Sequence, residues 1–414
     1  MFVMYQKPVL LERIAFGLKL DGSTEVSKKA LGKHAIKYLN EVNYTNTPHL
    51  NLFLSYSDMK LEDIKSGGPG GTEIERDVIL EKIIAHEYAD ALRLLESKDI
   101  VQNQYFQKLE CIANVHLLAK GYHSVQELGT YLMDVDNKGL HGNEEQSLRR
   151  LKLLICASYY MEGKFFECCS NFCKYAENES DLLGYSSEGL LLKKEYILMV
   201  TISSVVSVPL DNYAKFIYLQ PVNRIRDQSK VLLNCMEPLI QTRFKDFFKY
   251  WNETIGESCY PCLFVIDQWN FAQLIMRSKI YFFYLRISTK LGISYMAKIL
   301  GIDERQTRDE IHQLVDSTGL NVQIVDDVIS YKNNHLFLDA VEKLKMNEVR
   351  LQSILEDQKK NNVKLRDEVQ QNIINNEEVI EETVRREQGN IIDQQSFLNE
   401  DMDIDDDITM DEVE

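Results

Sequence analysis

The eight histidines are the side chains best suited to metal or acid–base chemistry, and their spacing excludes the usual metalloprotease motifs. They are His34, His49, His86, His116, His123, His141, His312 and His335. No two of them form a His-X-His or His-Glu-X-X-His pair, the spacings that bring two imidazoles onto one zinc ion. His86-Glu87 lacks the second histidine, so we interpret it as part of a surface helix. The sequence therefore predicts no metal ligands.

A possible calcium loop follows the third predicted helix of the central region. Asp134-Val-Asp-Asn-Lys-Gly139 with Glu145 places acids at positions one, three and twelve and glycine at position six. That spacing resembles an EF-hand loop. Position five is Lys138, a cation where an oxygen ligand is needed. We therefore expect no calcium binding.

The cysteines indicate a reducing compartment rather than a disulfide framework. Eight of them are scattered through helix-like segments. Cys259-Tyr-Pro-Cys262 has the spacing of a redox motif, but a thioredoxin-like site needs an α/β setting, and the surroundings read as all helical. Cys168-Cys169 and Cys173 share one predicted helix with no companion ligands for zinc. We interpret all of them as small core residues.

Nucleotide-binding and nucleophile motifs are also missing from the sequence. Ser66-Gly-Gly-Pro-Gly-Gly71 is followed by no Gly-Lys-Ser/Thr, so it is interpreted as a linker rather than a phosphate loop. Gly184-Tyr-Ser-Ser-Glu-Gly189 has the wrong spacing for a nucleophile elbow. We predict no catalytic residue, no cofactor and no enzymatic activity.

Composition narrows the class further. The chain has 414 residues, 44% of them hydrophobic and 10% aromatic, which suffices for one large or two medium cores. A formal net charge of -17 disfavours contact with bulk nucleic acid or anionic membranes. There is no run of about 18 apolar residues and no secretory signal pattern, so we expect neither a membrane span nor secretion. The predicted location is the cytoplasm and nucleus.

Apolar periodicity divides the chain into segments and predicts a mostly α fold. We assign residues 1–65 to an N-terminal region, 66–72 to a Gly-rich linker and 73–255 to TPR-like helical repeats. Leu148 to Tyr160 and Phe165 to Tyr175 predict an antiparallel helix pair joined at Gly163. Glu188 to Ser207 predicts a strongly apolar helix, and Ser124 is expected to cap another.

Residues 256–335 read as a winged helix. Ile280 to Leu291 predicts a helix that Gly292 ends, and Ser294 then caps a second, Tyr295 to Leu300. Asp303 begins a third helix. Two short strands from Val322 to Tyr331 turn at Asp326-Asp327. Three helices and a hairpin make a winged-helix module, a fold that serves both DNA readers and assembly domains.

Particular residues of this module resemble the end of the PCI domain. They are Ser294-Tyr-Met-Ala-Lys-Ile-Leu-Gly-Ile302, Glu310-Ile-His-Gln-Leu-Val315 and Gly319-Leu-Asn-Val-Gln-Ile324. The family's proteins occur in the proteasome lid, the COP9 signalosome and translation initiation factor 3. The sequence departs where Ile324 is followed by Val325 rather than by an aspartate. The resemblance implies a non-catalytic assembly subunit.

The hairpin Tyr-Tyr-Met-Glu-Gly-Lys-Phe-Phe at residues 159–166 is similar to the subunit 1 branch of the COP9 signalosome, in a divergent fungal form. That resemblance implies a scaffold that supports cullin deneddylation beside other PCI subunits and a separate metalloprotease. Alternatives are a subunit of the proteasome lid or of initiation factor 3, or a PCI adaptor in RNA processing or export.

Family PCI subunits associate wing to wing, so the resemblance implies contacts along the wing edge. The predicted contact residues are Val322, Ile324, Val328, Ile329 and Tyr331. The alternative is that these residues cover their own helices. The predicted recognition helix carries Arg305 and Arg308 against a larger number of acids, so nucleic-acid binding is disfavoured.

The C-terminal part reads as a long helix, or two, over residues 336–386, followed by a disordered acidic tail at 387–414. Apolar residues recur in the helix at three- and four-residue steps, and Gln358 to Asn362 interrupts them. We predict packing against partner helices. The predicted contacts are Leu344, Leu351, Ile354, Leu355, Leu365 and Val369.

Overall fold

The structure is a computed structural model of the whole chain, and it divides into two compact units, residues 1–332 and 333–414. It describes residues 7–57, 77–99, 104–132, 143–179, 182–183, 189–228, 230–288, 290–320, 322–331 and 334–388. The Gly-rich linker, the calcium-like loop Asp134–Gly139, the Gly184 motif and the acidic tail from residue 389 onward lie outside these residues. The predicted mostly α fold is confirmed.

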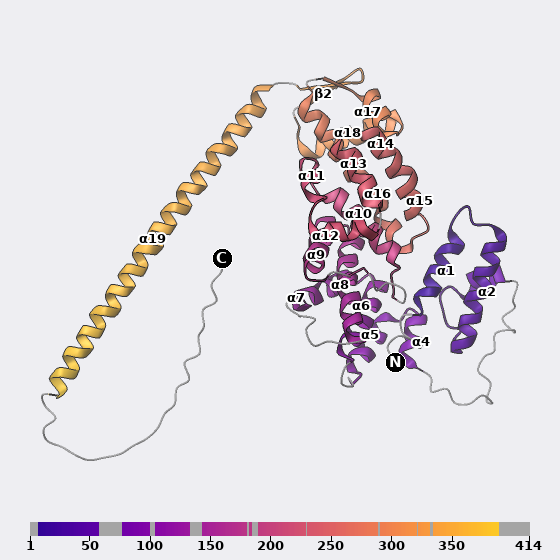
Figure 1. The fold of residues 1–414 in the computed structure, drawn as a ribbon, viewed down its shortest axis with the longest axis horizontal. Coiled ribbons are helices and arrows are strands. Elements are labelled where there is room, and N and C mark those ends of the chain that lie inside the picture. Colours follow the sequence, from indigo (N-terminus) through magenta and orange to yellow (C-terminus); the bar gives the residue numbers. More distant parts are fainter. Residues whose placement is uncertain are drawn as a thin grey trace, which may run out of the picture. The chain divides into compact units, whose positions relative to one another are not determined.

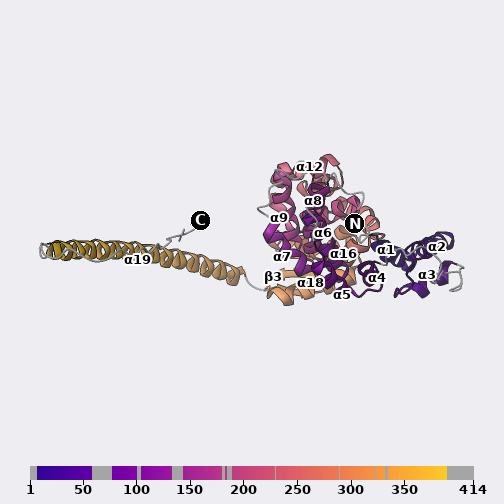
Figure 2. The same ribbon diagram turned by 90° about the horizontal axis from the view of Figure 1, so that it is seen from below.

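Three helices lie at the start of the chain (Figures 1 and 2) and contribute to the smaller of two hydrophobic clusters among the described residues. They are α1 (Val9–Lys19), α2 (Glu25–Val42) and α3 (Leu50–Ser57). Thr24 caps α2 because its hydroxyl accepts the Ser27 N–H at 3.2 Å. These helices pack with α4 (Val78–Ile84) and α5 (Tyr88–Ser97) through shared buried residues such as Leu39 and Ile83.

The helical array continues as antiparallel pairs. Its next members are α6 (Tyr105–Leu118), α7 (Tyr122–Leu132), α8 (Asn143–Met161) and α9 (Phe165–Asn178). The predicted α8–α9 pair is present, and its turn uses Gly163 at φ 83°. One prediction was wrong: Ser124 lies inside α7 rather than at its cap.

The second half of the array surrounds one buried helix, α10 (Lys193–Ser207), which packs against α8, α9, α13 and α16. The remaining elements are η3 (Leu210–Asn212), α11 (Tyr213–Phe216), α12 (Gln220–Gln228), α13 (Val231–Ile240), α14 (Phe244–Lys249), the π-helix η4 (Tyr250–Ile255), α15 (Gly256–Cys259) and α16 (Leu263–Ile287). Within the described residues no single helix is long and apolar enough to cross a membrane; only the bent pair of α10 and residues 210–216 passes on length and composition.

A compact C-terminal module ends the first unit. It contains β1 (Lys290–Gly292), α17 (Ile293–Leu300), α18 (Glu304–Thr318), β2 (Val322–Val325) and β3 (Val328–Tyr331). The strands form an antiparallel sheet in the order β1-β3-β2. The sequence predicted that Gly292 ends a helix, but α16 ends at Ile287 and Gly292 instead closes a strand that pairs with Val328. Gly292, not Ser294, holds the N-cap position of α17.

The second unit is one helix, α19 (Asn334–Gln388), of 55 residues. At 1.5 Å per residue, it is roughly 80 Å long. The polar stretch Gln358–Asn362 interrupts the apolar stripe, but the helix runs through it without a break. Of the side chains described along it, Val341 is half-buried and those from Lys343 to Asn372 are exposed.

Candidate interaction surfaces

The hairpin of the C-terminal module is set by its turn. Val325 pairs with Val328, so Asp326 and Asp327 form a two-residue loop. Both have positive φ, 46° and 71°, which is the backbone of a type I′ turn and suits aspartate better than branched residues. Arg308 of α18 contacts the Asp327 carboxylate and so ties the turn to the helix below it. The turn predicted from Asp326-Asp327 is confirmed.

The added strand β1 changes which residues lie at an edge. β3 pairs with β1 on one side and with β2 on the other, so it is the central strand. Val328, Ile329 and Tyr331 were predicted as edge residues. The prediction was wrong for Val328 and Ile329, because both pair with β1, a strand that no sequence signal at residues 290–292 indicated. Tyr331 pairs with Val322 of β2. Of the predicted set, only Val322 and Ile324 lie on an outer strand.

Burial divides the same five residues again. Val322 and Ile329 are buried in the core beneath the sheet, and Ile324 packs partly against it. Val328 is exposed, as is Val325, which was not predicted. The side chain of Tyr331 lies outside the described residues. The apolar surface that this sheet offers to a partner is therefore the pair beside the turn, Val325 and Val328.

A buried ion pair fixes α18 against α16. The Arg277 guanidinium donates to both Glu310 carboxylate oxygens at 2.8–3.1 Å, and the Tyr281 hydroxyl donates to Glu310 at 2.9 Å. Burial, together with the Glu310 charge, raises the pKa of Tyr281 well above its ordinary value. Gln306 adds a further hydrogen bond at 3.0 Å. Part of the polar face of α18 therefore forms hydrogen bonds inside the module.

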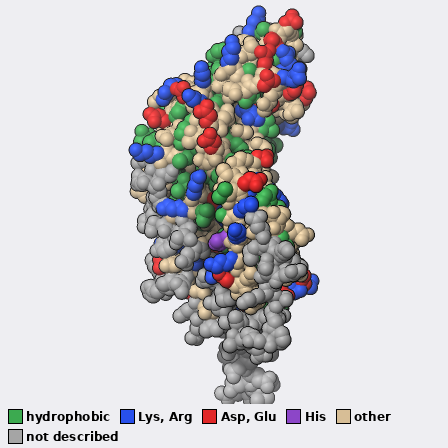
Figure 3. Space-filling model, turned by 90° about the vertical axis from the view of Figure 1, so that its right-hand side faces the viewer, with side chains coloured by type: hydrophobic (Ala, Val, Ile, Leu, Met, Phe, Trp, Pro, Cys, Tyr) green, Lys and Arg blue, Asp and Glu red, His purple; other side chains and the backbone are tan. Residues whose placement is uncertain are grey.

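The charges of this module do not suit nucleic acid. On α18, Arg308 lies beside Asp327 and 3.9 Å from Glu304, so its charge is offset. Basic and acidic side chains are also mixed over the face drawn in Figure 3, where no extended basic patch is visible among the described residues. Phosphate binding needs an excess of positive charge, which this arrangement lacks.

Along α19, the predicted apolar residues lie on the surface of the second unit. All six predicted contact residues are exposed, between 46% and 68%. Leu344, Leu351 and Leu365 follow a strict seven-residue spacing, with the polar Gln358 in the intervening place. Seven-residue spacing is the seam of a coiled coil, and a polar residue in that seam selects register at some cost in stability.

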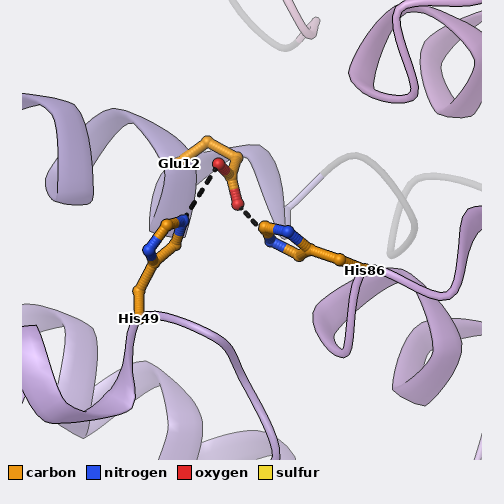
Figure 4. A group of neighbouring side chains, drawn as sticks. All are labelled: Glu12, His49 and His86. Carbon is orange, nitrogen blue, oxygen red and sulfur yellow. Dashed lines mark hydrogen bonds and ion pairs between the residues drawn. The ribbon is translucent and has the colours of Figure 1, made fainter.

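Three side chains far apart in the sequence converge at the junction between α1–α3 and the array (Figure 4). Glu12 of α1 bonds the Nε2 atom of His86 at 2.6 Å and the Nε2 atom of His49 at 3.3 Å. Burial opposes the Glu12 charge, but the hydrogen bonds and charges of the two histidines outweigh it and lower its pKa to about 2. No sequence spacing could have found this group, because its members come from three elements.

His86 itself is not on a helix surface as predicted. It lies in the turn between α4 and α5 at φ 62°, partly buried. The cysteines are free thiols, all buried except the half-buried Cys173.

Two models of one protein family match most of this chain. The family model described as "CSN11 N-terminal domain" matches residues 1–273, and the model described as "CSN11 C-terminal domain" matches residues 290–413.

The chain belongs to the CSN11 family.

Members of the CSN11 family in three yeasts are similar over most of this chain. A Saccharomyces cerevisiae protein named Cop9 signalosome complex subunit 11 is 32% identical over 404 residues, 90% of each chain. A Candida glabrata protein named COP9 signalosome complex subunit 11 is 27% identical over 96% of each chain. An Eremothecium gossypii protein of the same name is 28% identical over 71% of this chain and 72% of its own.

The expected relation to the COP9 signalosome is therefore confirmed at the level of the family. The CSN11 relatives carry the number 11, and none of them is named as subunit 1. The proteasome lid and initiation factor 3 are not favoured by these names.

Proposed function

We propose that this chain is a non-catalytic scaffold subunit of a COP9-signalosome-like complex. Its role is to position other PCI subunits so that a separate metalloprotease removes Nedd8 from cullins. The observation that carries the proposal is α19, a helix of 55 residues whose apolar residues are exposed. The names of the CSN11 relatives supply the identity of the complex.

The exposed stripe of α19 supports a helical partner. An isolated helix gains nothing from apolar residues in water, whereas burial of a leucine contributes on the order of 1 kcal/mol or more. Leu351 and Ile354 lie three residues apart and form one contiguous face, and Leu365 and Val369 form a second. Gln358 between the two faces would select one register of the partner helices.

The C-terminal module supports a second, smaller contact. Its β1–β3–β2 sheet with α17 and α18 has the element order of a winged helix, and we assign it to the PCI domain. β2 leaves one edge of its backbone open, an arrangement that a partner strand can extend. Val325 on β2 and Val328, its partner on β3 across the turn, are exposed apolar residues at one end of that edge. We propose that a neighbouring PCI subunit contacts this corner.

Within the complex, we propose a place related to the subunit 1 branch. The support is the sequence resemblance at residues 159–166, which form the α8–α9 hairpin with its Gly163 turn and precede the buried α10 and the C-terminal module. The helical array would then extend outward as an arm. We further propose that the protein resides in the cytoplasm and nucleus, where cullins are modified.

Affinity capture tests this proposal. The tagged full-length chain is purified from its native cell, and bound proteins are identified by mass spectrometry. A Leu351→Glu/Leu365→Glu variant places two charges in the stripe, and we expect at least a tenfold loss of signalosome subunits and metalloprotease. The matched control, Ser353→Glu/Lys360→Glu, makes charge changes on the same exposed helix outside the stripe and should retain them.

Three results would count against the proposal. Recovery of proteasome-lid or initiation-factor subunits would move the chain to another complex. Recovery of RNA-processing factors alone would favour an adaptor role. Equal capture by the stripe variant and its control would show that α19 does not carry the contact.

A further inference from the structure

The residues Glu12, His49 and His86 form a group that the proposed scaffold function does not use. Their candidate ligand atoms all lie within 4.8 Å of one another. The three side chains are partly buried, with 19% to 27% of each exposed. Two imidazoles and one carboxylate are a donor set that zinc prefers, because zinc accepts nitrogen and oxygen ligands in a tetrahedral arrangement.

We propose that Glu12, His49 and His86 bind one divalent transition-metal ion of the zinc class. This site would clamp α1, the start of α3 and the α4–α5 turn together.

The geometry is close to what an ion requires. Zinc bonds of about 2.0–2.1 Å place tetrahedral ligand atoms about 3.4 Å apart. The Glu12 oxygens already lie 2.6 Å from His86 Nε2 and 3.3 Å from His49 Nε2. Shifts below about 1 Å therefore bring all three onto one ion. Each imidazole would bind through Nε2 in its neutral form, with its proton on Nδ1, and the Glu12 carboxylate is already ionised at neutral pH.

Neighbouring rings hold the two imidazoles in place. The His86 ring stacks on Tyr88, with centroids 5.3 Å apart and 24° between planes. The His49 ring meets Phe53 edge-on at 6.0 Å, and the two histidine rings meet at 5.3 Å and 75°. Ligands whose orientation is fixed before binding lose less conformational entropy when the ion arrives.

The backbone of His86 fixes its direction as well. The His86 N–H bonds the Ile83 carbonyl at 3.1 Å and the Glu87 N–H bonds the Lys82 carbonyl at 2.8 Å, the paired bonds that end a helix in a left-handed residue. Glycine usually holds that position. Lys120 and Thr242 adopt the same conformation elsewhere, so the turn orients His86 without itself indicating a ligand.

Solvent and a fourth ligand have access to the group. Glu12 lines a hollow of about 150 Å³ together with Tyr88 and Tyr122. Lys120 and Asp267, of opposite charge, line the same hollow. A zinc ion held by three protein ligands keeps its fourth position for water, and the partial exposure of the three side chains admits a water molecule.

Direct metal binding is the test. The full-length chain is treated with EDTA, dialysed and titrated with Zn²⁺ by isothermal calorimetry, and with Co²⁺ by visible absorption. We expect one tight equivalent of zinc and the intense d–d bands of a four-coordinate cobalt ion. Bound zinc should also raise the Tm by a few degrees, because only the folded chain presents the site.

Two variants separate a metal ligand from a hydrogen-bond donor. His49→Gln keeps a side-chain N–H that can reach Glu12, and His86→Asn suits the left-handed turn, but neither retains an imidazole. We expect each to weaken the tight zinc equivalent by at least about 100-fold while the far-UV circular dichroism stays unchanged. His123→Ala removes an exposed histidine that pairs with Glu127 in the same helix, and this control should bind zinc as the wild type does.

The competing account is that Glu12 simply holds two histidines by hydrogen bonds. A folded wild-type chain that takes up no tight zinc would establish that account and overturn the proposal. So would equal zinc uptake by the wild type and by both histidine variants, since the ion would then sit elsewhere. Neither result bears on the scaffold function, because capture of signalosome subunits is measured separately.

Discussion

Two helices of this protein, α10 and α19, differ in whether their apolar side chains are buried by the chain itself. In α10, every residue from Glu195 to Val206 is buried, and four helices surround it. Its one buried carboxylate, Glu195, is paired with Arg13 at 2.5 Å and accepts the Leu192 N–H at 2.8 Å. In α19, the apolar side chains described are exposed, and charged residues separate them.

The two helices differ in where their packing partners come from. Short helices depend on tertiary packing, and α10 obtains that packing from its own chain. A long helix that is polar on most faces and apolar along one stripe is typical of a surface that pairs with other helices. The first unit therefore supplies its own packing, whereas α19 leaves its apolar stripe exposed for the helical partner that we propose.

The largest effect on the first unit should come from breaking the ion pair of its C-terminal module. Glu310→Ala leaves the nearly buried Arg277 without its carboxylate, since the pair is only 10% exposed on either side. We expect a loss of about 4 kcal/mol in the free energy of unfolding, measured by urea denaturation. Glu304→Ala on the exposed face of the same helix is the control and should cost less than about 0.5 kcal/mol. Equal losses would show that the module is not held by this pair.

A cavity in α10 should cost somewhat less. Ile202 is fully buried, and Ile202→Ala removes three carbon atoms from a packed site. We expect a loss of about 3 kcal/mol in the free energy of unfolding, seen as a lower urea midpoint. A loss below about 1 kcal/mol would mean that the surrounding helices collapse onto the cavity, and the contrast with α19 would weaken.

The junction of α1 with the array should give a smaller, pH-dependent effect. Because the pKa of Glu12 falls from 4.5 to about 2 on folding, its ionised form stabilises the folded chain above about pH 4.5. That contribution is lost as the pH falls from about 4.5 to about 2. In EDTA, Glu12→Gln should therefore cost about 2 kcal/mol at pH 6, and the difference from wild type should shrink towards pH 3. A constant difference across this range would show that Glu12 acts through packing rather than charge.

The smallest effect on stability is expected in α19, although its effect on assembly should be the largest. Leu351→Ala/Leu365→Ala shortens two exposed side chains. The free energy of unfolding of the isolated chain, measured by urea denaturation, should change by less than about 0.5 kcal/mol, since no core is disturbed. Capture of partner subunits should nevertheless fall. A clear drop in the stability of the isolated chain would show that the stripe is already buried against the chain itself in solution.

The sequence by itself determined the helical class and many helix positions. Apolar residues at three- and four-residue steps predicted α8, α9 and α10, and Gly163 predicted the turn between α8 and α9. Both signals are local, because apolar periodicity and glycine geometry do not depend on which segments pack together. Asp303 marked the start of α18, and its carboxylate accepts the Arg305 N–H at 3.0 Å. Asp326-Asp327 likewise predicted the hairpin turn.

Only the tertiary structure decided which residues meet. Strand β1 follows a helix with no turn signal and forms because β3 offers it partners 36 to 40 residues further on, from the Gly292–Val328 pair to the Lys290–Ser330 pair. This pairing moved Val328 and Ile329 from an edge to the centre of the sheet. Glu12, His49 and His86 are 37 residues apart in each step of sequence, too far for any spacing rule. Long-range pairing depends on the whole packed core, and no local pattern contains it.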